Sequence, residues 1–140
     1  MIENYKIIGS FIKDMSSETP DSPTYIFVKD KISKYRLNID INSKAVKDGI
    51  IEVNTIIKFS DQPEILKKAY FEITYTSIVK VDKKVSDKNE MEKIILCDVP
   101  NKIYPNLKRI FLNLLTDSGY PGIKFEKKID FIELYKQRTN

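Results

Sequence analysis

Apolar and polar residues alternate along four stretches in the first 81 residues of the chain. The clearest runs from residue 35 to 42, where every second side chain is apolar and those between are charged or amidic. The others are 5–15, 51–59 and 69–81. Because successive side chains of a β-strand point to opposite faces, each stretch predicts a strand. The strand at 5–15 is expected to have both faces partly covered, and the other three to have one face toward a core. Turn-forming residues predict hairpin connections at 47–49 and 60–64.

The period of the pattern changes near residue 100. Apolar residues then recur at spacings of three and four, which is typical of an amphipathic helix. They are Ile103, Leu107, Ile110, Phe111, Leu114 and Leu115. Pro105 fits the first turn of this helix, and Gly119 fits the left-handed cap that ends it. Asp130 is an N-cap residue that predicts the start of a second, shorter helix.

The segment between the first two predicted strands, residues 16–34, has no regular pattern. Pro20 and Pro23 interrupt any strand ladder, so we expect an ordered crossover loop that carries the apolar cluster at 25–28. No linker or internal repeat divides the chain, which predicts a single domain over residues 1–140. The expected fold class is α+β, with a four-stranded antiparallel sheet followed by one long and one short helix packed on it.

The residue composition argues against an enzyme. The chain contains no histidine, the side chain most used for acid–base chemistry and zinc binding. Its one cysteine, Cys97, lies in the apolar run 94–97 and is expected to be a buried side chain rather than a nucleophile or ligand. Carboxylates are plentiful, but no pair is distinguished by its spacing. We therefore expect no catalytic residues, no cofactor and no metal site.

The net charge of +4 and the pI near 9.0 raise the question of nucleic-acid binding. Only three of the 24 basic residues are arginine, and the lysines are interspersed with 20 carboxylates. This mixture is typical of a solvated surface, and the outward strand positions lack the aromatic platform of sheets that bind single strands. We expect no nucleic-acid partner, and a small basic nucleic-acid-binding domain is kept as the alternative from another class.

The chain also lacks the features of a membrane or secreted protein. No apolar run approaches the roughly 20 residues that span a bilayer, and residues 1–6 do not resemble the start of a secretory signal. A single cysteine cannot form an internal disulfide. We therefore expect a cytoplasmic protein without direct membrane insertion.

Three segments share the order and spacing of a known family. Residues 12–23 contain lysine–aspartate, a spaced glutamate and two prolines. Residues 99–109 contain proline–asparagine, then an aromatic–proline pair and a basic residue. Gly-Tyr-Pro at 119–121 precedes Ile-Asp-Phe and Leu-Tyr within 129–135. Together, over about residues 5–136, these segments resemble the SecB family of protein-export chaperones.

The resemblance implies an ATP-independent holding chaperone that binds unfolded precursor proteins and delivers them to the SecA translocation motor. It further implies a homotetramer built as a dimer of dimers. The client groove would lie between the crossover loop and the last helix, bringing Tyr25 and Phe27 near Phe131 and Tyr135. Its implied lining is Tyr25, Phe27, Phe131, Leu134 and Tyr135.

The resemblance implies two further surfaces. The docking face for SecA would contain Asp14, Glu18, Tyr70 and Glu72. The subunit interfaces would contain Ile7, Ile8 and Phe11 of the first strand and Ile103, Leu107, Phe111 and Leu114 of the long helix. Members of the family are usually acidic and have a longer C-terminal tail, so this basic chain leaves the strength of SecA coupling open. A SecB-like chaperone for another client, such as a toxin–antitoxin pair, is the alternative, and the client, its affinity and the balance of dimer and tetramer stay open.

Overall fold

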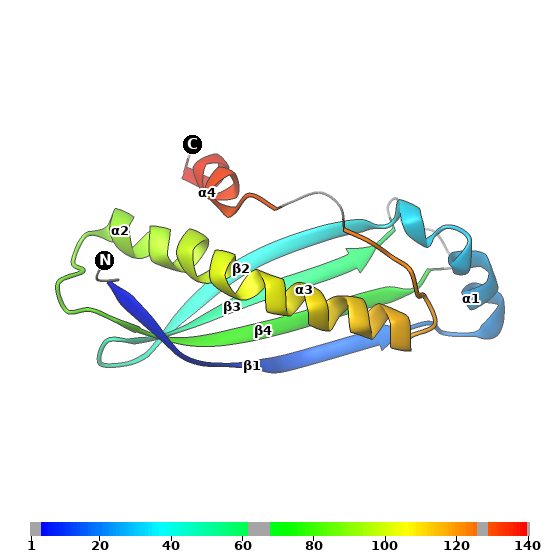
Figure 1. Ribbon diagram of the computed structural model, residues 1–140, viewed down its shortest axis with the longest axis horizontal. Helices are drawn as coiled ribbons and strands as arrows, with labels where there is room; N and C mark the ends of the chain where they lie inside the picture. The colour runs from blue at the N-terminus through cyan, green and yellow to red at the C-terminus, as the bar shows by residue number, and fades with distance from the viewer. Residues whose placement is uncertain (1–3, 62–67, 126–128, 140) are drawn as a thin grey trace.

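The strands form one antiparallel sheet in the order β1-β4-β3-β2 (Figure 1). They are β1 (Tyr5–Glu18), β2 (Arg36–Lys47), β3 (Ile50–Ser60) and β4 (Tyr70–Val81). This computed structural model describes residues 4–61, 68–125 and 129–139. Both β1 and β2 are edge strands of the described sheet, because each has only one neighbour. The predicted antiparallel sheet is confirmed.

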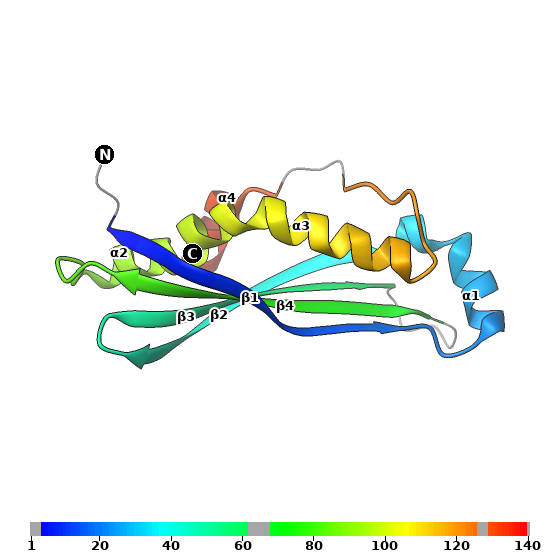
Figure 2. The same ribbon diagram turned by 60° about the horizontal axis from the view of Figure 1, so that its bottom comes forward.

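The helices follow or connect these strands. They are α1 (Ser22–Lys29), η1 (Ile32–Lys34), α2 (Lys88–Lys93), η2 (Ile94–Asp98), α3 (Val99–Asp117) and α4 (Phe131–Thr139). The segments α2, η2 and α3 are continuous and form one long helix across a single face of the sheet (Figure 1). The opposite face carries no helix of the described residues (Figure 2). One long and one short helix after the sheet were predicted, and both are confirmed.

The crossover segment is not the loop that we expected, because it contains the helix α1. The carboxylate of Asp21 accepts a hydrogen bond from the Thr24 N–H at 2.8 Å and caps the helix. Pro23 occupies the first turn, where the missing N–H of proline is not needed. The proline therefore marks the start of a helix, while β1 ends earlier, at Glu18.

The long helix begins at Lys88, well before residue 100, near which the change of period predicts its start. Asp87 caps α2 by accepting a hydrogen bond from the Asn89 N–H at 3.1 Å. Pro105 consequently lies inside α3 rather than in a first turn, which corrects our expectation. Because η2 is a π-turn, the positions before Val99 do not follow the three- and four-residue spacing that we used to find the helix.

Two predicted helix boundaries are confirmed. Gly119 has a φ of 101° after the end of α3, and a side chain there would meet the ring of Tyr25 at 2.8 Å. Asp130 accepts hydrogen bonds from the N–H groups of Ile132 (3.0 Å) and Glu133 (3.1 Å) at the start of α4. Of the turn predicted at 60–64, residues 62–64 lie outside the described residues.

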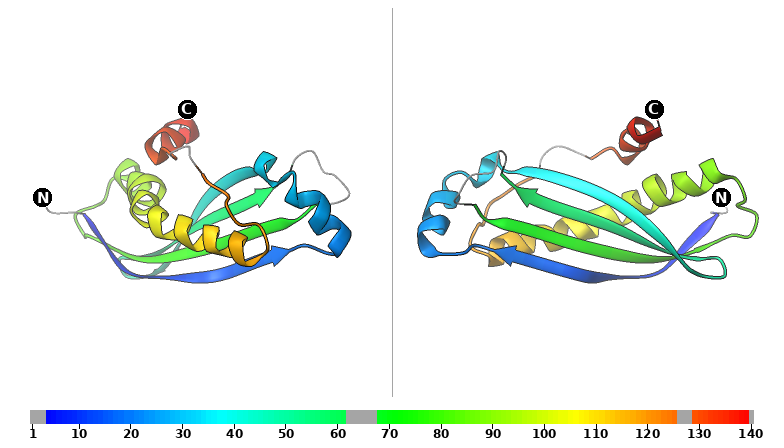
Figure 3. Two further views of the ribbon diagram at one scale, coloured as in Figure 1. Left: turned by 45° about the vertical axis from the view of Figure 1, so that its right-hand side comes forward. Right: turned by 180° about the vertical axis from the view of Figure 1, so that it is seen from behind.

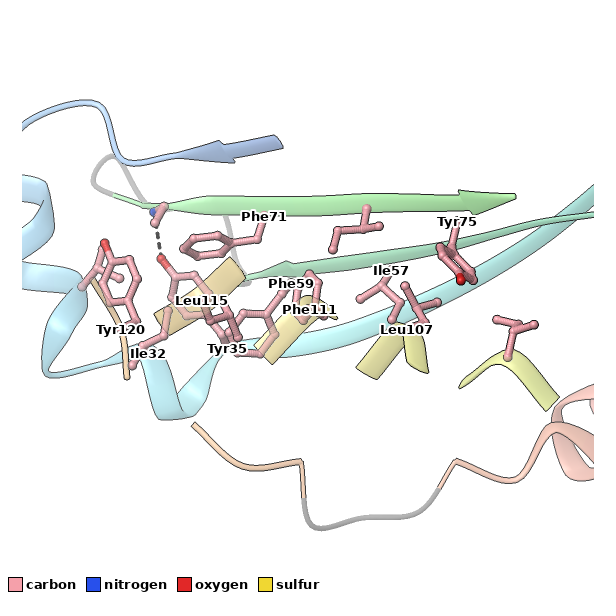
Figure 4. Close-up of a cluster of buried hydrophobic side chains, with 14 residues drawn as sticks. Ile32, Tyr35, Ile57, Phe59, Phe71, Tyr75, Leu107, Phe111, Leu115 and Tyr120 are labelled. Carbon is pink, nitrogen blue, oxygen red and sulfur yellow. Dashed lines mark hydrogen bonds between the residues drawn. The ribbon is translucent and has the colours of Figure 1, made fainter. Parts of the chain in front are cut away.

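The helix-covered face of the sheet carries two groups of buried side chains. The aromatic cluster, shown in Figure 4, is centred on Tyr35, Phe59, Phe71, Phe111 and Tyr120. In it the Ala69 N–H donates to the Tyr35 hydroxyl at 2.9 Å. The second cluster contains Ile41, Val53, Val79, Val81, Val85, Ile94, Cys97, Val99 and Phe131. The apolar residues at every second position of the predicted strand at 69–81 belong to these clusters, as its alternating pattern predicts: Ala69, Phe71, Ile73 and Tyr75 to the first and Val79 to the second.

Candidate functional site

An apolar groove lies between β2, η2 and α4. It has a volume of about 220 Å³. Its lining residues are Ile39, Asp40, Ile41, Leu96, Leu134 and Tyr135. Five of these six side chains are aliphatic or aromatic, and Asp40 is charged. We call this hollow the β2–α4 groove.

The α4 wall of the groove is held in place by one buried ring. Phe131 is 1% exposed, and its ring packs edge-on against Tyr104 of α3 with centroids 5.5 Å apart. The Tyr135 hydroxyl donates a long hydrogen bond of 3.4 Å to the Asn89 carbonyl of α2. Leu134 is still 40% exposed. One buried aromatic side chain therefore anchors the helix, and apolar side chains such as Leu134 stay accessible to a ligand.

The structure does not bring the predicted groove residues of the crossover segment together with those of α4. Tyr25 lies on α1, packs against Tyr120 with ring centroids 5.3 Å apart, and donates a 2.8 Å hydrogen bond to the Gly119 carbonyl. Phe27 is half-buried, with the Lys31 ammonium 4.8 Å from the centre of its ring. In Figures 1 and 3, α1 covers one end of the sheet and α4 lies away from it. The groove is therefore built on one side by α4 alone, without α1.

Three groove residues were missed by the sequence reasoning: Ile39, Ile41 and Leu96. The alternating pattern of β2 correctly placed the two isoleucines on the inward face. The pattern could not show that β2 is an edge strand, nor that α3 does not cross the sheet over the middle of β2. The inward face of β2 is therefore only partly covered at the groove. Ile39 is accordingly half-buried rather than buried.

Three of the four predicted docking residues lie side by side. Glu18 of β1 is the register partner of Tyr70 on β4. The Tyr70 hydroxyl donates to Glu72 at 2.6 Å, and Lys58 lies 3.6 Å from the same carboxylate. Burial and the hydrogen bond to Glu72 raise the pKa of Tyr70 to about 12. These side chains belong to the face of the sheet opposite the long helix.

The fourth docking residue, Asp14, lies further along the same edge. It pairs with Thr74, and the register places it on the same face as Glu18. Four residues of extended strand separate them by about 13 Å. Next to Glu18 is a hollow of about 450 Å³. Its lining residues are Ser17, Glu18, Thr19, Pro20, Lys68 and Tyr70.

The predicted interface residues divide into exposed and covered ones. Ile8 and Phe11 on β1 are 54% and 47% exposed, while Ile7 is half-buried. On the long helix, by contrast, the inward row is buried against the sheet of the same protomer, and it includes Ile103, Leu107 and Phe111. Leu114 is half-buried. Among the predicted interface residues, the exposed ones therefore lie on the β1 edge, where Ile12 and Met15 are also exposed.

The described residues offer little reactive chemistry. Cys97 is buried, as expected, and burial raises the pKa of its thiol. Within residues 4–61, 68–125 and 129–139 there is no group of three cysteine, aspartate or glutamate side chains that could hold a metal ion. No described helix is both long enough and apolar enough to cross a membrane.

The same arrangement of strands and helices occurs in a solved chaperone. The Rv1957 SecB-like chaperone of Mycobacterium tuberculosis, solved in complex with a ChAD peptide from the HigA1 antitoxin, has a TM-score of 0.68. The match covers 90% of this chain and 88% of that one at 11% sequence identity. A protein of unknown function from Streptococcus agalactiae matches with a TM-score of 0.52. The fold is thus that of a SecB-like chaperone.

The sequence comparisons then define the family. The family model for preprotein translocase subunit SecB matches residues 2–140, so the chain belongs to the SecB family, a family of protein-export chaperones. It is 89% identical over its full length to a putative protein-export protein SecB of Pelagibacter ubique, which it covers completely. It is 27% identical over 135 residues to the protein-export protein SecB of Rhodospirillum rubrum, covering 95% of this chain and 81% of that one. The family resemblance noted in the sequence is confirmed.

Proposed function

We propose that the protein is an ATP-independent holding chaperone of the cytoplasm that binds unfolded precursor chains in the β2–α4 groove. The observation that supports this most is an open hollow lined by Ile39, Ile41, Leu96, Leu134 and Tyr135. Unfolded chains expose apolar side chains that folded proteins cover, and burying them contributes about 25 cal/mol per Å². A groove with few fixed polar groups can accept many sequences.

We further propose that the chain assembles as a homotetramer, a dimer of dimers. An edge strand with exposed apolar side chains is a template for pairing with another strand. On β1, the side chains of Ile8, Phe11, Ile12 and Met15 are all at least 42% exposed. Pairing of β1 with a second copy would cover this edge. Several copies would also present several grooves to one client, which raises affinity through effective concentration.

The delivery step would use the uncovered face of the sheet. Glu18 and Glu72 place two carboxylates around Tyr70 next to a hollow of about 450 Å³. Glu72 already pairs with Lys58. Glu18 and Asp14, by contrast, are exposed carboxylates that suit a basic partner, and such complementary charges would increase the rate of association. We propose that this face, extended along β1 to Asp14, is where SecA docks.

A second candidate client has some support from the solved relative. The Mycobacterium tuberculosis chaperone is bound to a peptide from an antitoxin. At 11% identity that match establishes only the fold, whereas the protein 89% identical to this chain carries a protein-export name. Export is therefore the better supported role. A toxin–antitoxin operon around the gene would favour the other client.

The holding function can be tested by mixing the purified protein with a chemically unfolded secretory precursor. Static light scattering would follow aggregation and the mass of any complex, and enzyme activity or fluorescence would follow refolding. We expect a soluble complex, slower refolding and less aggregation, all without nucleotide. A precursor that refolds or aggregates at the same rate with and without the protein contradicts the proposal.

The groove assignment has a matched control on the same helix. Leu134→Asp combined with Tyr135→Asp places two charges in the groove, and we expect it to weaken client binding by about tenfold or more. Ile132→Asp changes a side chain of α4 that is 54% exposed and does not line the groove. We expect near-normal binding from this control, and unchanged assembly in both variants. Equal binding by all three proteins would show that clients bind elsewhere.

A further inference from the structure

The long helix contains one turn with an additional residue. In η2 the Val99 N–H bonds to the Ile94 carbonyl, five residues earlier, instead of the four of an α-helix. After this turn the side chains that face the sheet are four residues apart, and they are Val99, Ile103, Leu107, Phe111 and Leu115. Two buried residues of this helix precede Val99: Cys97, within the π-turn itself, and Ile94, which lies five residues before Val99.

Helix geometry explains what the turn accomplishes. Five residues of α-helix correspond to about 500°, which would turn Ile94 about 140° away from Val99. A π-turn accommodates all five residues in one turn, so that Ile94 (3% exposed) and Val99 (0% exposed) face the same core. The flanking helices therefore keep their inward rows, and the additional residue enlarges the turn between them.

The enlarged turn lies under the groove. Leu96, at its centre, is a groove residue together with the β2 and α4 side chains. Both β2 and α4 pack directly against η2. Helix α4 also reaches past the turn in both directions, because Tyr135 bonds to Asn89 before it and Phe131 packs on Tyr104 after it. The short helix is thus laid across the π-turn.

We infer that the additional residue of the π-turn Ile94–Asp98 positions α4 and builds the floor of the β2–α4 groove, with Leu96 as a specificity-determining residue. The part of this inference that concerns client binding rests on the proposed function. The part that concerns the seating of α4 does not, since it is a property of the protein alone. An uninterrupted α-helix would present a narrower surface to β2 and α4, and the groove would lose its floor.

Deleting Ile95 tests the inference, because Ile94 would then stand four residues before Val99 and keep its inward position in a regular α-helix. We expect the variant to fold and assemble normally. In the absence of client, we expect amide exchange of residues 131–136 to accelerate by about tenfold. We also expect affinity for reduced and carboxymethylated lysozyme, a chain that stays unfolded in native buffer, to fall by about tenfold.

The control deletes Ser86, an exposed residue between β4 and α2, and leaves the π-turn in place. We expect wild-type exchange and affinity from it. A folded Ile95 deletion with unchanged α4 exchange and unchanged affinity overturns the inference. If that deletion does not fold, Leu96→Ser in the intact π-turn tests the role of Leu96. Unchanged affinity of this variant for the unfolded chain also overturns the inference. Failure of the wild-type protein to bind the unfolded chain contradicts the proposed function instead. Amide exchange of α4 in the Ile95 deletion then still tests whether the π-turn positions α4.

Discussion

The two ends of the helix-covered face use apolar side chains in different ways. At the α1 end, the ring of Phe59 lies 5.4 Å from Tyr35, 6.0 Å from Phe111 and 5.5 Å from Phe125, measured between centroids. Tyr35, Phe59 and Phe111 are buried among other side chains of the aromatic cluster (Figure 4), and Phe125 is partly buried against them. At the other end, the α4 side chains Leu134 and Tyr135 border an open groove. The first end is closed by packing, and the second is open to a ligand.

The difference shows that residue type alone does not separate a core from a binding surface. Tyr25 and Phe27 are aromatic, as is Tyr135 of α4, but α1 packs at the closed end of the sheet. Leu134 and Tyr135 belong to a short helix that one ring, Phe131, holds over an edge strand. Position along the sheet therefore separates Tyr25 and Phe27 from Leu134 and Tyr135, which border the groove.

The largest expected effect is a change at the closed end. Phe71→Ala would remove a fully buried ring that contacts Phe59 and Tyr120. We expect the free energy of unfolding to fall by about 3–5 kcal/mol, because the loss of contacts and the cavity both cost stability. Urea denaturation measures this. A loss below about 1 kcal/mol would show that the closed end is not the main source of stability.

A smaller effect on stability and a larger one on binding are expected from Phe131→Ala. The ring is the α4 side chain that is buried in the second cluster and packs against Tyr104, so its removal should release this helix before it unfolds the sheet. We expect faster amide exchange over residues 131–136 and about tenfold weaker binding of an unfolded chain. Phe131→Leu, which keeps an apolar side chain at this position, should retain most of the exchange protection of α4 and most of the affinity for the unfolded chain. Unchanged exchange in the alanine variant would contradict the anchoring role.

The smallest effect concerns the face opposite both ends. Because the pKa of Tyr70 is raised from 10.0 to about 12, this residue stabilises the fold fully below pH 10 and loses that contribution as the pH rises toward 12. The tyrosinate absorbance of the wild type minus that of Tyr70→Phe measures the titration. Glu72→Gln should lower the pKa of Tyr70, since it removes the negative charge beside the hydroxyl. Titration of Tyr70 at its ordinary value in the wild type would contradict this account of the docking face.

Strands and helix faces could be predicted from the sequence, because periodicity is a local signal. The alternation at 35–42 and the inward row that includes Leu107 both hold in the structure. The helix α1 was missed because Pro23 was interpreted as a break in a strand rather than as a first-turn residue. The early start of the long helix was missed because the π-turn breaks the spacing.

The candidate groove could be predicted only in part, since it depends on which distant segments meet. Leu134 and Tyr135 were expected on the same side of the last helix, and in the structure both line the β2–α4 groove. Nothing in the sequence indicates that α1 and α4 pack at different places along the sheet. For the same reason Ile39 and Ile41 were expected only in the core, although Ile39 is half-buried and both residues line the groove.

The central claim is that unfolded polypeptide binds at the open end of the molecule and not at the closed end. Amide hydrogen exchange of the whole protein, with and without a saturating unfolded precursor, tests this most directly. We expect new protection in residues 39–41, 94–98 and 131–136 and no change in α1, residues 22–29. Protection confined to α1, with none in the three groove segments, would contradict the claim.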